Sequence, residues 1–213
     1  MERQNQPASG PPNRPVGRRT LILFPIIHTQ ADMGALSEPI QRMKVAKLGT
    51  KSLERNFELV NRLWTQIEQT LEGMTIPYEQ LRVYQDGLPV CGHELEIVSV
   101  LAKAGSRNHQ LLLKLKHKGA TIMGSESSEL LVEEYQLLHQ AFSAPRSKVP
   151  ARVASPGRNL QDSLLQRRDQ YLGARINTTL QKGETVLLFL GMLHSVESWL
   201  AKDIRVVRHI RHL

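Results

Sequence analysis

Four residues whose side chains can transfer protons or bind metals each follow a short apolar run in this chain. They are His28, Asp86, Glu126 and His194. The apolar runs have the length and composition of β-strands and cover residues 21–27, 81–84, 120–123 and 186–190. Parallel strands all end at the same edge of a sheet, so these side chains would meet there although they lie far apart in the sequence. The pattern predicts a site at the carboxyl edge, which makes the chain a candidate enzyme.

Three more charged residues are candidates for the same site. Glu94 follows the second predicted strand, in the first turn of a predicted helix. Arg168 interrupts a row of leucine and isoleucine residues at helical spacing. Its stem could lie along this row with the guanidinium in water, or the guanidinium could clamp a carboxylate or a phosphate. Asp169 is its expected local partner.

The strand-end residues also have structural explanations. A histidine at a strand end is often a solvated loop residue. Asp86 begins an Asp-Gly pair, which is common in turns. Glu126 could stabilise the positive end of the helix that follows it. The sequence leaves both interpretations open for these residues.

Strand-like and helix-like segments alternate along the chain. A last strand is expected at residues 204–207. Helices are predicted at residues 53–71, 95–102, 111–116, 129–142 and 155–180. The alternation predicts an α/β fold, with a mostly parallel sheet of about five strands and helices on both faces. A single domain over residues 19–213 is expected, because 213 residues suffice for one sizeable domain but hardly for two.

Two segments lack apolar periodicity. Residues 1–18 hold four prolines and two glycines and are predicted to be a disordered tail. Residues 143–155, with Pro145 and Pro150, are predicted to be a mobile linker or lid.

The net charge of +8 lies mainly in residues 1–18 and 143–155 and at the C-terminus, and only 5% of residues are aromatic. Nucleic acid is therefore not an expected partner.

Cysteine usage favours a reducing compartment. The single cysteine, Cys91, cannot form an internal disulfide, so a cytoplasmic location is expected. No segment is long and apolar enough to span a membrane, and no membrane partner is expected. Cys91 is only a weak candidate nucleophile.

The chain has no glycine-rich phosphate loop and no Gly-x-Ser-x-Gly motif, so nucleotide-driven chemistry and serine hydrolysis have no support.

A pattern of three segments runs through residues 167–207. Arg168-Asp169 lies on a predicted helix, Gly191-Met192-Leu193-His194 ends a strand, and a short last strand follows. In order and spacing this resembles the C-terminal signature of the TraB/GumN proteins, which belong to a superfamily with the Tiki metalloproteases and the erythromycin esterases. That family has a second Gly-x-x-His at the end of its first strand. The segment here is Pro25-Ile26-Ile27-His28, with the histidine but not the glycine.

The resemblance implies both site residues and an activity. It marks His28, His194 and Arg168, with Asp169 at a position usually taken by Asn or Asp. It also implies an acidic residue, for which Glu94 and Glu126 are the candidates. Members of the superfamily include metal-dependent peptidases and metal-independent hydrolases. The expected function is a TraB/GumN-like hydrolase that acts on a small-molecule or peptide substrate.

Two mechanisms fit these residues. In one, His28, His194 and a carboxylate from Asp86, Glu94 or Glu126, of which Glu94 is the first choice, hold a divalent metal whose bound water is nucleophilic near neutral pH. In the other, a histidine paired with a carboxylate is the general base for water, and Arg168 neutralises the developing oxyanion. A non-enzymatic alternative is a binding or regulatory protein that holds an anionic small molecule at the same edge.

Overall fold

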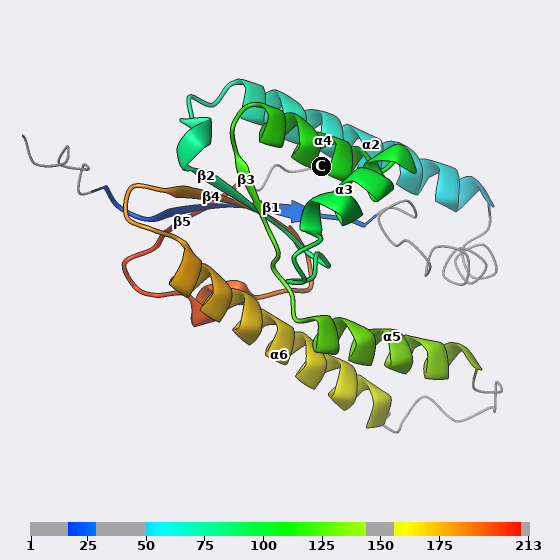
Figure 1. Ribbon diagram of the computed structural model, residues 1–213. Coiled ribbons are helices and arrows are strands. Elements are labelled where there is room, and N and C mark those ends of the chain that lie inside the picture. The colour runs from blue at the N-terminus through cyan, green and yellow to red at the C-terminus, as the bar shows by residue number, and fades with distance from the viewer. Residues whose placement is uncertain (1–16, 29–49, 144–155, 210–213) are drawn as a thin grey trace, which may run out of the picture.

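The computed structural model describes residues 17–28, 50–143 and 156–209. Its centre is a five-stranded sheet in the order β3-β2-β4-β1-β5, in which all paired neighbours are parallel (Figure 1). The strands are β1 (Thr20–Ile26), β2 (Leu81–Gln85), β3 (Thr121–Met123), β4 (Thr185–Gly191) and β5 (Arg205–Arg208). The prediction of an α/β fold with a mostly parallel sheet is confirmed.

Helices cover both faces of this sheet (Figure 1). One face carries α2 (Thr50–Glu72), α3 (Glu94–Lys103) and α4 (Arg107–His117). The other carries α6 (Pro156–Thr179), with α5 (Ser128–Ser143) packed beside it. Two short 3-10 turns are η2 (Tyr78–Gln80) and η3 (Val196–Trp199).

The core on the α2 side forms between an apolar helix stripe and the central strands. Trp64, Ile67 and Leu71 recur at helical spacing along α2, and all three are buried. They pack in one cluster with Phe24 of β1 and Phe189 of β4. The ring centroids of Trp64 and Phe189 lie 6.1 Å apart. This packing fixes α2 over the two strands that precede the predicted histidines.

A second core lies on the α6 side of the sheet. Leu172, Ile176 and Leu180 at the C-terminal end of α6 and just after it pack in one cluster with Leu21 of β1 and Leu188 of β4. Alternate residues of β4 enter the two cores, so the strand is buried on both faces. Strands of this kind have nearly continuous apolar sequences, which explains why β4 is easy to recognise in the sequence.

The predicted segments match the observed elements, with the largest shift at the start of α4. The sequence predicts a helix over residues 111–116, whereas α4 begins at Arg107. The Ser106 side chain accepts a hydrogen bond from the His109 N–H at 3.2 Å and so caps the helix. A serine directly after Gly105 is the sequence signal for this start.

Most of the predicted tail (residues 1–16) and of the predicted linker (residues 144–155) lies outside the described residues. Gly17 is described, and its carbonyl accepts a hydrogen bond from the Gly183 N–H at 3.0 Å.

None of the described helices combines the length and the apolar character that crossing a membrane would require.

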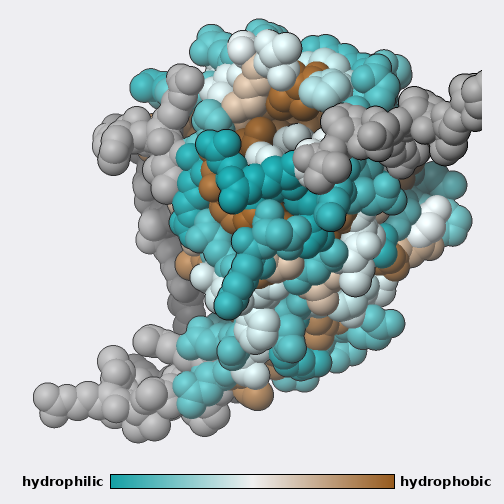
Figure 2. All heavy atoms as spheres, turned by 90° about the vertical axis from the view of Figure 1, so that its left-hand side faces the viewer, coloured by the Kyte–Doolittle hydropathy of each residue, from teal (hydrophilic) through white to brown (hydrophobic). Residues whose placement is uncertain are grey.

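The edge at which the strands begin carries charged residues in pairs that are exposed or part-buried. Arg19 binds Asp203 at 2.6 Å, and Arg82 binds Glu184 at 2.5 Å. This side of the molecule is mostly hydrophilic, with smaller apolar patches between the charged residues (Figure 2). Four charged residues near the opposite edge, Asp86, Glu126, Arg168 and Asp169, are buried, and they belong to the candidate site.

Candidate functional site

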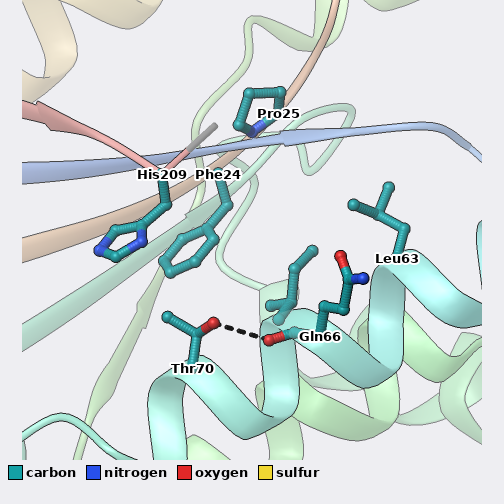
Figure 3. A pocket seen from close by; sticks show the side chains of 7 residues that line it. Phe24, Pro25, Leu63, Gln66, Thr70 and His209 are labelled. Atoms are coloured by element: carbon teal, nitrogen blue, oxygen red, sulfur yellow. Dashed lines mark hydrogen bonds between the residues drawn. The ribbon is translucent and has the colours of Figure 1, made fainter. Parts of the chain in front are cut away.

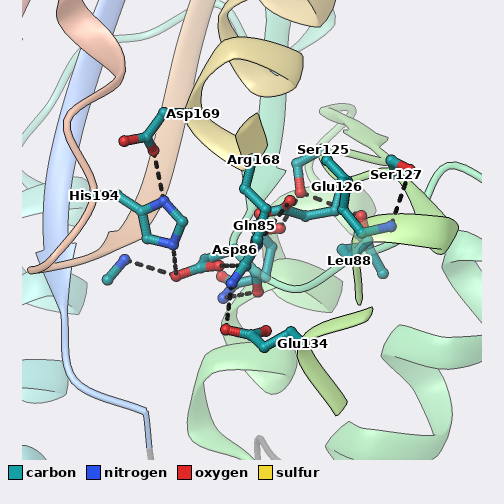
Figure 4. Close-up of polar contacts among 12 residues, drawn as sticks. Gln85, Asp86, Leu88, Ser125, Glu126, Ser127, Glu134, Arg168, Asp169 and His194 are labelled. Atoms are coloured by element: carbon teal, nitrogen blue, oxygen red, sulfur yellow. Dashed lines mark hydrogen bonds and ion pairs between the residues drawn. The ribbon is translucent and has the colours of Figure 1, made fainter. Parts of the chain in front are cut away.

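The carboxyl ends of the strands bring the four predicted strand-end residues together. Asp86 Oδ2 lies 3.0 Å from His28 Nε2 and 3.5 Å from His194 Nε2. Asp86, Glu126 and His194 offer ligand atoms that lie within 4.8 Å of one another. The Asp86 N–H donates to the Phe189 carbonyl at 2.9 Å, which extends the pairing of β2 with β4 by one residue. We define the edge cluster as His28, Asp86, Glu126, Arg168, Asp169 and His194; Figure 4 labels the last five of these.

Asp86 is the centre of the edge cluster. Its Oδ1 accepts a hydrogen bond from Arg168 Nη2 at 2.8 Å. Its Oδ2 accepts from His28 Nε2 at 3.0 Å and from the Gly191 N–H at 2.9 Å. Burial raises the pKa of Asp86, but the hydrogen bond from His28 and the neighbouring positive charges outweigh burial and hold the pKa well below its usual range. Asp86 is therefore an anion at neutral pH.

Gly191 stands where no side chain fits. A Cβ at this position would lie 2.7 Å from Asp86 Oδ2, which is closer than real contacts allow, and 3.6 Å from His28 Nε2. The His194 N–H donates to the Gly191 carbonyl at 3.1 Å and closes the turn between them. The Gly-x-x-His pattern after β4 thus has a physical reason. Glycine lets the backbone approach Asp86, and the turn brings the histidine back to the same carboxylate.

Arg168 is buried and is bound by three carboxylates. Nε and Nη2 donate to Glu126 at 3.2 and 3.0 Å, Nη2 donates to Asp86 at 2.8 Å, and Nη1 donates to Glu134 at 2.8 Å. Burial lowers the pKa of Arg168, but these carboxylates, led by Glu126, raise it above its ordinary value. The sequence allowed two positions for the guanidinium, in water or open to bind a ligand carboxylate or phosphate. It takes neither position, because carboxylates of the protein itself already bind it. It holds the edge cluster together from within.

Glu126 is fully buried, and Arg168 binds both of its oxygens. Burial raises the pKa of Glu126 above its ordinary value, and the charge of Asp86 adds to this, although Arg168 opposes both. Glu126 does not cap the helix that follows it. Ser127 does so, because its Oγ accepts from the Leu130 N–H at 3.2 Å.

Asp169 holds His194. Its Oδ1 accepts from His194 Nδ1 at 2.6 Å, and its Oδ2 accepts from the Ser195 N–H at 2.8 Å. The expectation that Asp169 is the partner of Arg168 is wrong, because adjacent helix residues point about 100° apart. Burial lowers the pKa of His194, but the hydrogen bond to Asp169 and the charge of Asp86 outweigh burial and raise the pKa above its ordinary value of 6.5.

We expect protonated His194 to stabilise the fold in a pH-dependent way. Because the folded pKa lies above the ordinary value of 6.5, this stabilisation is fully present below pH 6.5 and is lost as the pH rises through the folded pKa. The difference in free energy of unfolding between the wild type and His194→Gln, measured by urea denaturation, should therefore be largest below pH 6.5 and shrink as the pH rises above it. A difference that stays constant or grows would show that His194 is neutral in the folded protein.

Glu94 has a local role at the start of α3. Its Oε1 accepts from the backbone N–H groups of Cys91 and Gly92 at 3.0 and 3.2 Å. Burial raises the pKa of Glu94, but the backbone hydrogen bonds outweigh it and lower the pKa. The carboxylate is thus used to close the loop before α3, and it is not part of the edge cluster.

The structure does not assemble the predicted metal set of His28, His194 and Glu94. Within the described ranges, the group with metal-ligand spacing is Asp86, Glu126 and His194. Two carboxylates and an imidazole are donors that suit a divalent cation. However, Arg168 binds both oxygens of Glu126 and Oδ1 of Asp86. A guanidinium takes the place that a metal would need, so this donor set does not fit a metal ion as it stands.

Glu134 is a member of the site that the sequence pattern did not indicate. Arg167 Nη1 donates to Glu133 at 2.8 Å, and Arg168 Nη1 donates to Glu134 at 2.8 Å. Two adjacent acidic residues on α5 thus face two adjacent basic residues on α6. This charge pattern is the signal by which the pairing could have been found.

A small hollow lies between β1 and α2 and shares no residue with the edge cluster (Figure 3). Its volume is about 20 Å³, which is roughly the space of one water molecule. Phe24, Pro25 and Leu63 make much of its wall, and the His209 ring stacks on Phe24 with centroids 5.1 Å apart. The hollow is too small for a substrate, so the edge cluster remains the candidate site.

The edge cluster combines features that are typical of sites that transfer protons. It contains a histidine in contact with a carboxylate that is fixed as an anion, and several of its groups have shifted pKa values.

The chain matches no family model, no curated protein and no solved structure.

Proposed function

We propose that the protein is a hydrolase in which His28 is the general base and Asp86 orients it. The observation that carries this is the 3.0 Å contact between His28 Nε2 and Asp86 Oδ2, with Asp86 held as an anion by the hydrogen bond from His28 and by the positive charges around it, including Arg168. A histidine paired with a fixed carboxylate is a common arrangement for activating water. The His28 side chain is 28% exposed, whereas those of Asp86 and His194 are 4% and 5% exposed. His28 is therefore the member of the three that a substrate can reach.

Hydrolysis of an ester or an amide follows from these roles. His28 takes a proton from water while the water oxygen forms a bond to the acyl carbon. The bond from this carbon to the leaving oxygen or nitrogen then breaks, and His28 passes the proton to the leaving group. Asp86 stabilises the imidazolium that exists between these two proton transfers.

Arg168 acts through the carboxylates that it binds, not on the substrate. Its charge compensates those of Asp86 and Glu126, which would otherwise repel each other inside the protein. The oxyanion role that the sequence suggested would require N–H groups directed at the substrate. Four donor contacts from this guanidinium already go to carboxylates. In this proposal Arg168 is a positioning residue.

The resemblance to TraB/GumN proteins agrees with this proposal. The residues that it marks, His28, Arg168, Asp169 and His194, all belong to the edge cluster. The resemblance also allows a metal-dependent reaction, and the 4.8 Å grouping of Asp86, Glu126 and His194 is the observation in its favour. Because Arg168 binds the same oxygens, we place no metal in the mechanism.

The test is a hydrolase screen with esters and peptides, carried out with and without a chelator and with metal analysis of the purified protein. We expect activity that survives the chelator. His28→Ala should reduce kcat/KM by about 10²- to 10⁴-fold, which is the usual contribution of a general base. His117→Ala, an exposed histidine on α4, is the matched control and should be neutral.

Two results would point to the alternatives. Activity that disappears with the chelator and returns with a divalent metal supports the metal-dependent mechanism. Affinity for an anionic small molecule without any turnover supports the binding protein.

We place the reaction in a reducing compartment such as the cytoplasm, because Cys91 is a free and exposed thiol.

A further inference from the structure

Two large apolar side chains project from the turn that carries His194. Met192 is 64% exposed and Leu193 is 84% exposed. They are consecutive residues between Gly191 and His194, in the middle of the turn. Scattered exposed apolar residues are normal on protein surfaces, but two in succession at a polar site need a reason. We call Met192 and Leu193 the apolar lip.

The turn that presents the apolar lip is fixed at both ends. At its start, the Gly191 N–H donates to Asp86 Oδ2 at 2.9 Å. At its end, His194 Nδ1 donates to Asp169 Oδ1 at 2.6 Å, and the His194 N–H donates back to the Gly191 carbonyl at 3.1 Å. The lip is therefore held in place relative to Asp86, and little conformational freedom of this backbone is lost when a ligand covers it.

The strand register places the apolar lip beside His28. β1 and β4 are parallel neighbours, and Ile26 is paired with Gly191. Both strands end at this pair, and the chain runs on to His28 after β1 and into the turn with Met192 and Leu193 after β4, beyond the same edge of the sheet. A Cβ on Gly191, where the turn begins, would lie 3.6 Å from His28 Nε2. The partly exposed imidazole of His28 and the exposed apolar pair thus follow adjacent strand ends.

We infer that the apolar lip binds the acyl chain of the substrate and selects esters or amides with an extended aliphatic group next to the carbonyl. The inference rests on the proposed hydrolase function and adds the class of substrate. His28 acts at the carbonyl carbon, while Met192 and Leu193 cover the chain attached to it. Methionine suits this task because its flexible thioether adapts to different chain shapes.

The test is the hydrolysis of p-nitrophenyl acetate, butyrate and hexanoate. For the wild type we expect kcat/KM to rise by about two- to fourfold for each added methylene, the upper value corresponding to full burial of a CH₂ group. The double variant Met192→Ser/Leu193→Ser should hydrolyse the three esters at similar rates. Val100→Ser is the matched control, since Val100 is 65% exposed but lies on α3, and it should keep the rise.

Binding is measured separately, so that failure of the inference is distinguishable from failure of the proposed function. The probes are 2-hexanone and acetone, which carry a carbonyl but cannot be hydrolysed, and the readout is the methyl resonances of Met192 and Leu193. Stronger shifts with 2-hexanone are expected. Hydrolysis with no dependence on chain length, or a rise that persists in the double variant, overturns the inference and leaves the proposed function standing.

The remaining outcomes are equally decisive. If the wild type hydrolyses no ester faster than His28→Ala but still prefers 2-hexanone, the hydrolase is overturned and the lip stays as a ligand contact. If it shows neither property, both are overturned. A melting temperature that falls in the double variant but not in Val100→Ser shows that the lip packs against the chain itself, which also overturns the inference.

Discussion

Arg168→Met is expected to lower the free energy of unfolding by about 3–5 kcal/mol, the usual cost of removing one partner from a buried ion pair. The guanidinium binds Asp86 and Glu126, and both carboxylates are buried. Without it, two negative charges remain close together in the interior with no cation between them. Methionine keeps most of the aliphatic length of the side chain, so the loss reports the charged contacts rather than the packing. Urea denaturation at neutral pH measures it.

The neighbouring residue provides the control. Arg167 binds Glu133, but the two side chains are 51% and 42% exposed. Arg167→Met should therefore change the free energy of unfolding by no more than about 1 kcal/mol. Adding Glu126→Gln to Arg168→Met should recover part of the stability, because it removes one of the uncompensated charges. If Arg168→Met is no less stable than Arg167→Met, Arg168 is not the centre of a buried charge network.

The fold could be predicted because its central strands leave a clear signal. Residues 186–190 are apolar without interruption, since β4 is buried on both faces. The helix stripe that includes Trp64 and Leu71 has the spacing of a helix that covers a sheet. Strands alternating with helices leave few topologies other than a parallel sheet. These signals depend on local periodicity, which a single sequence contains.

The contacts within the site could be predicted only in part. The ends of the strands indicated that His28, Asp86 and His194 would meet, because one edge of a parallel sheet collects all strand ends. The partners of Arg168 and Asp169 depend on how α6 is rotated and on where α5 lies. Neither is encoded in the periodicity of α6 itself, so the pairing of these two residues was wrong. Glu94 was misplaced for a similar reason, since the loop before α3 uses its carboxylate locally.

The charge arrangement supports a functional rather than a purely structural role for the edge cluster. A buried ion network is seldom more stable than apolar side chains of the same volume, because its charges have been removed from water. Here the network comprises Arg168, two histidines and the carboxylates that contact them. The burial of Asp86 would favour its neutral form, yet the surrounding donors keep it ionised. In the proposed mechanism, an aspartate that stays charged in the interior serves proton transfer by the adjacent histidine, which gains nothing from a neutral partner.

Asp86→Asn is expected to reduce kcat by roughly 10⁴-fold, the loss seen when an orienting aspartate becomes asparagine in a histidine-based hydrolase. The amide has nearly the same shape as the carboxylate, but it cannot stabilise the imidazolium of His28. Its NH₂ group would also have to replace an acceptor that now faces hydrogen-bond donors. The measurement is the steady-state hydrolysis of the best ester from the screen, at neutral pH.

The effect of Asp86→Asn on stability should be smaller than that of Arg168→Met, at about 1–3 kcal/mol. Glu126 and Glu134 still bind the guanidinium in this variant, so no charge is left entirely without a partner. Asp203→Asn is the control, because Asp203 is exposed and pairs with Arg19 at the opposite edge of the sheet. It should leave kcat unchanged. If Asp86→Asn keeps its activity within tenfold of the wild type while remaining folded, His28 does not depend on Asp86, and the general-base mechanism must be abandoned even if the protein is a hydrolase.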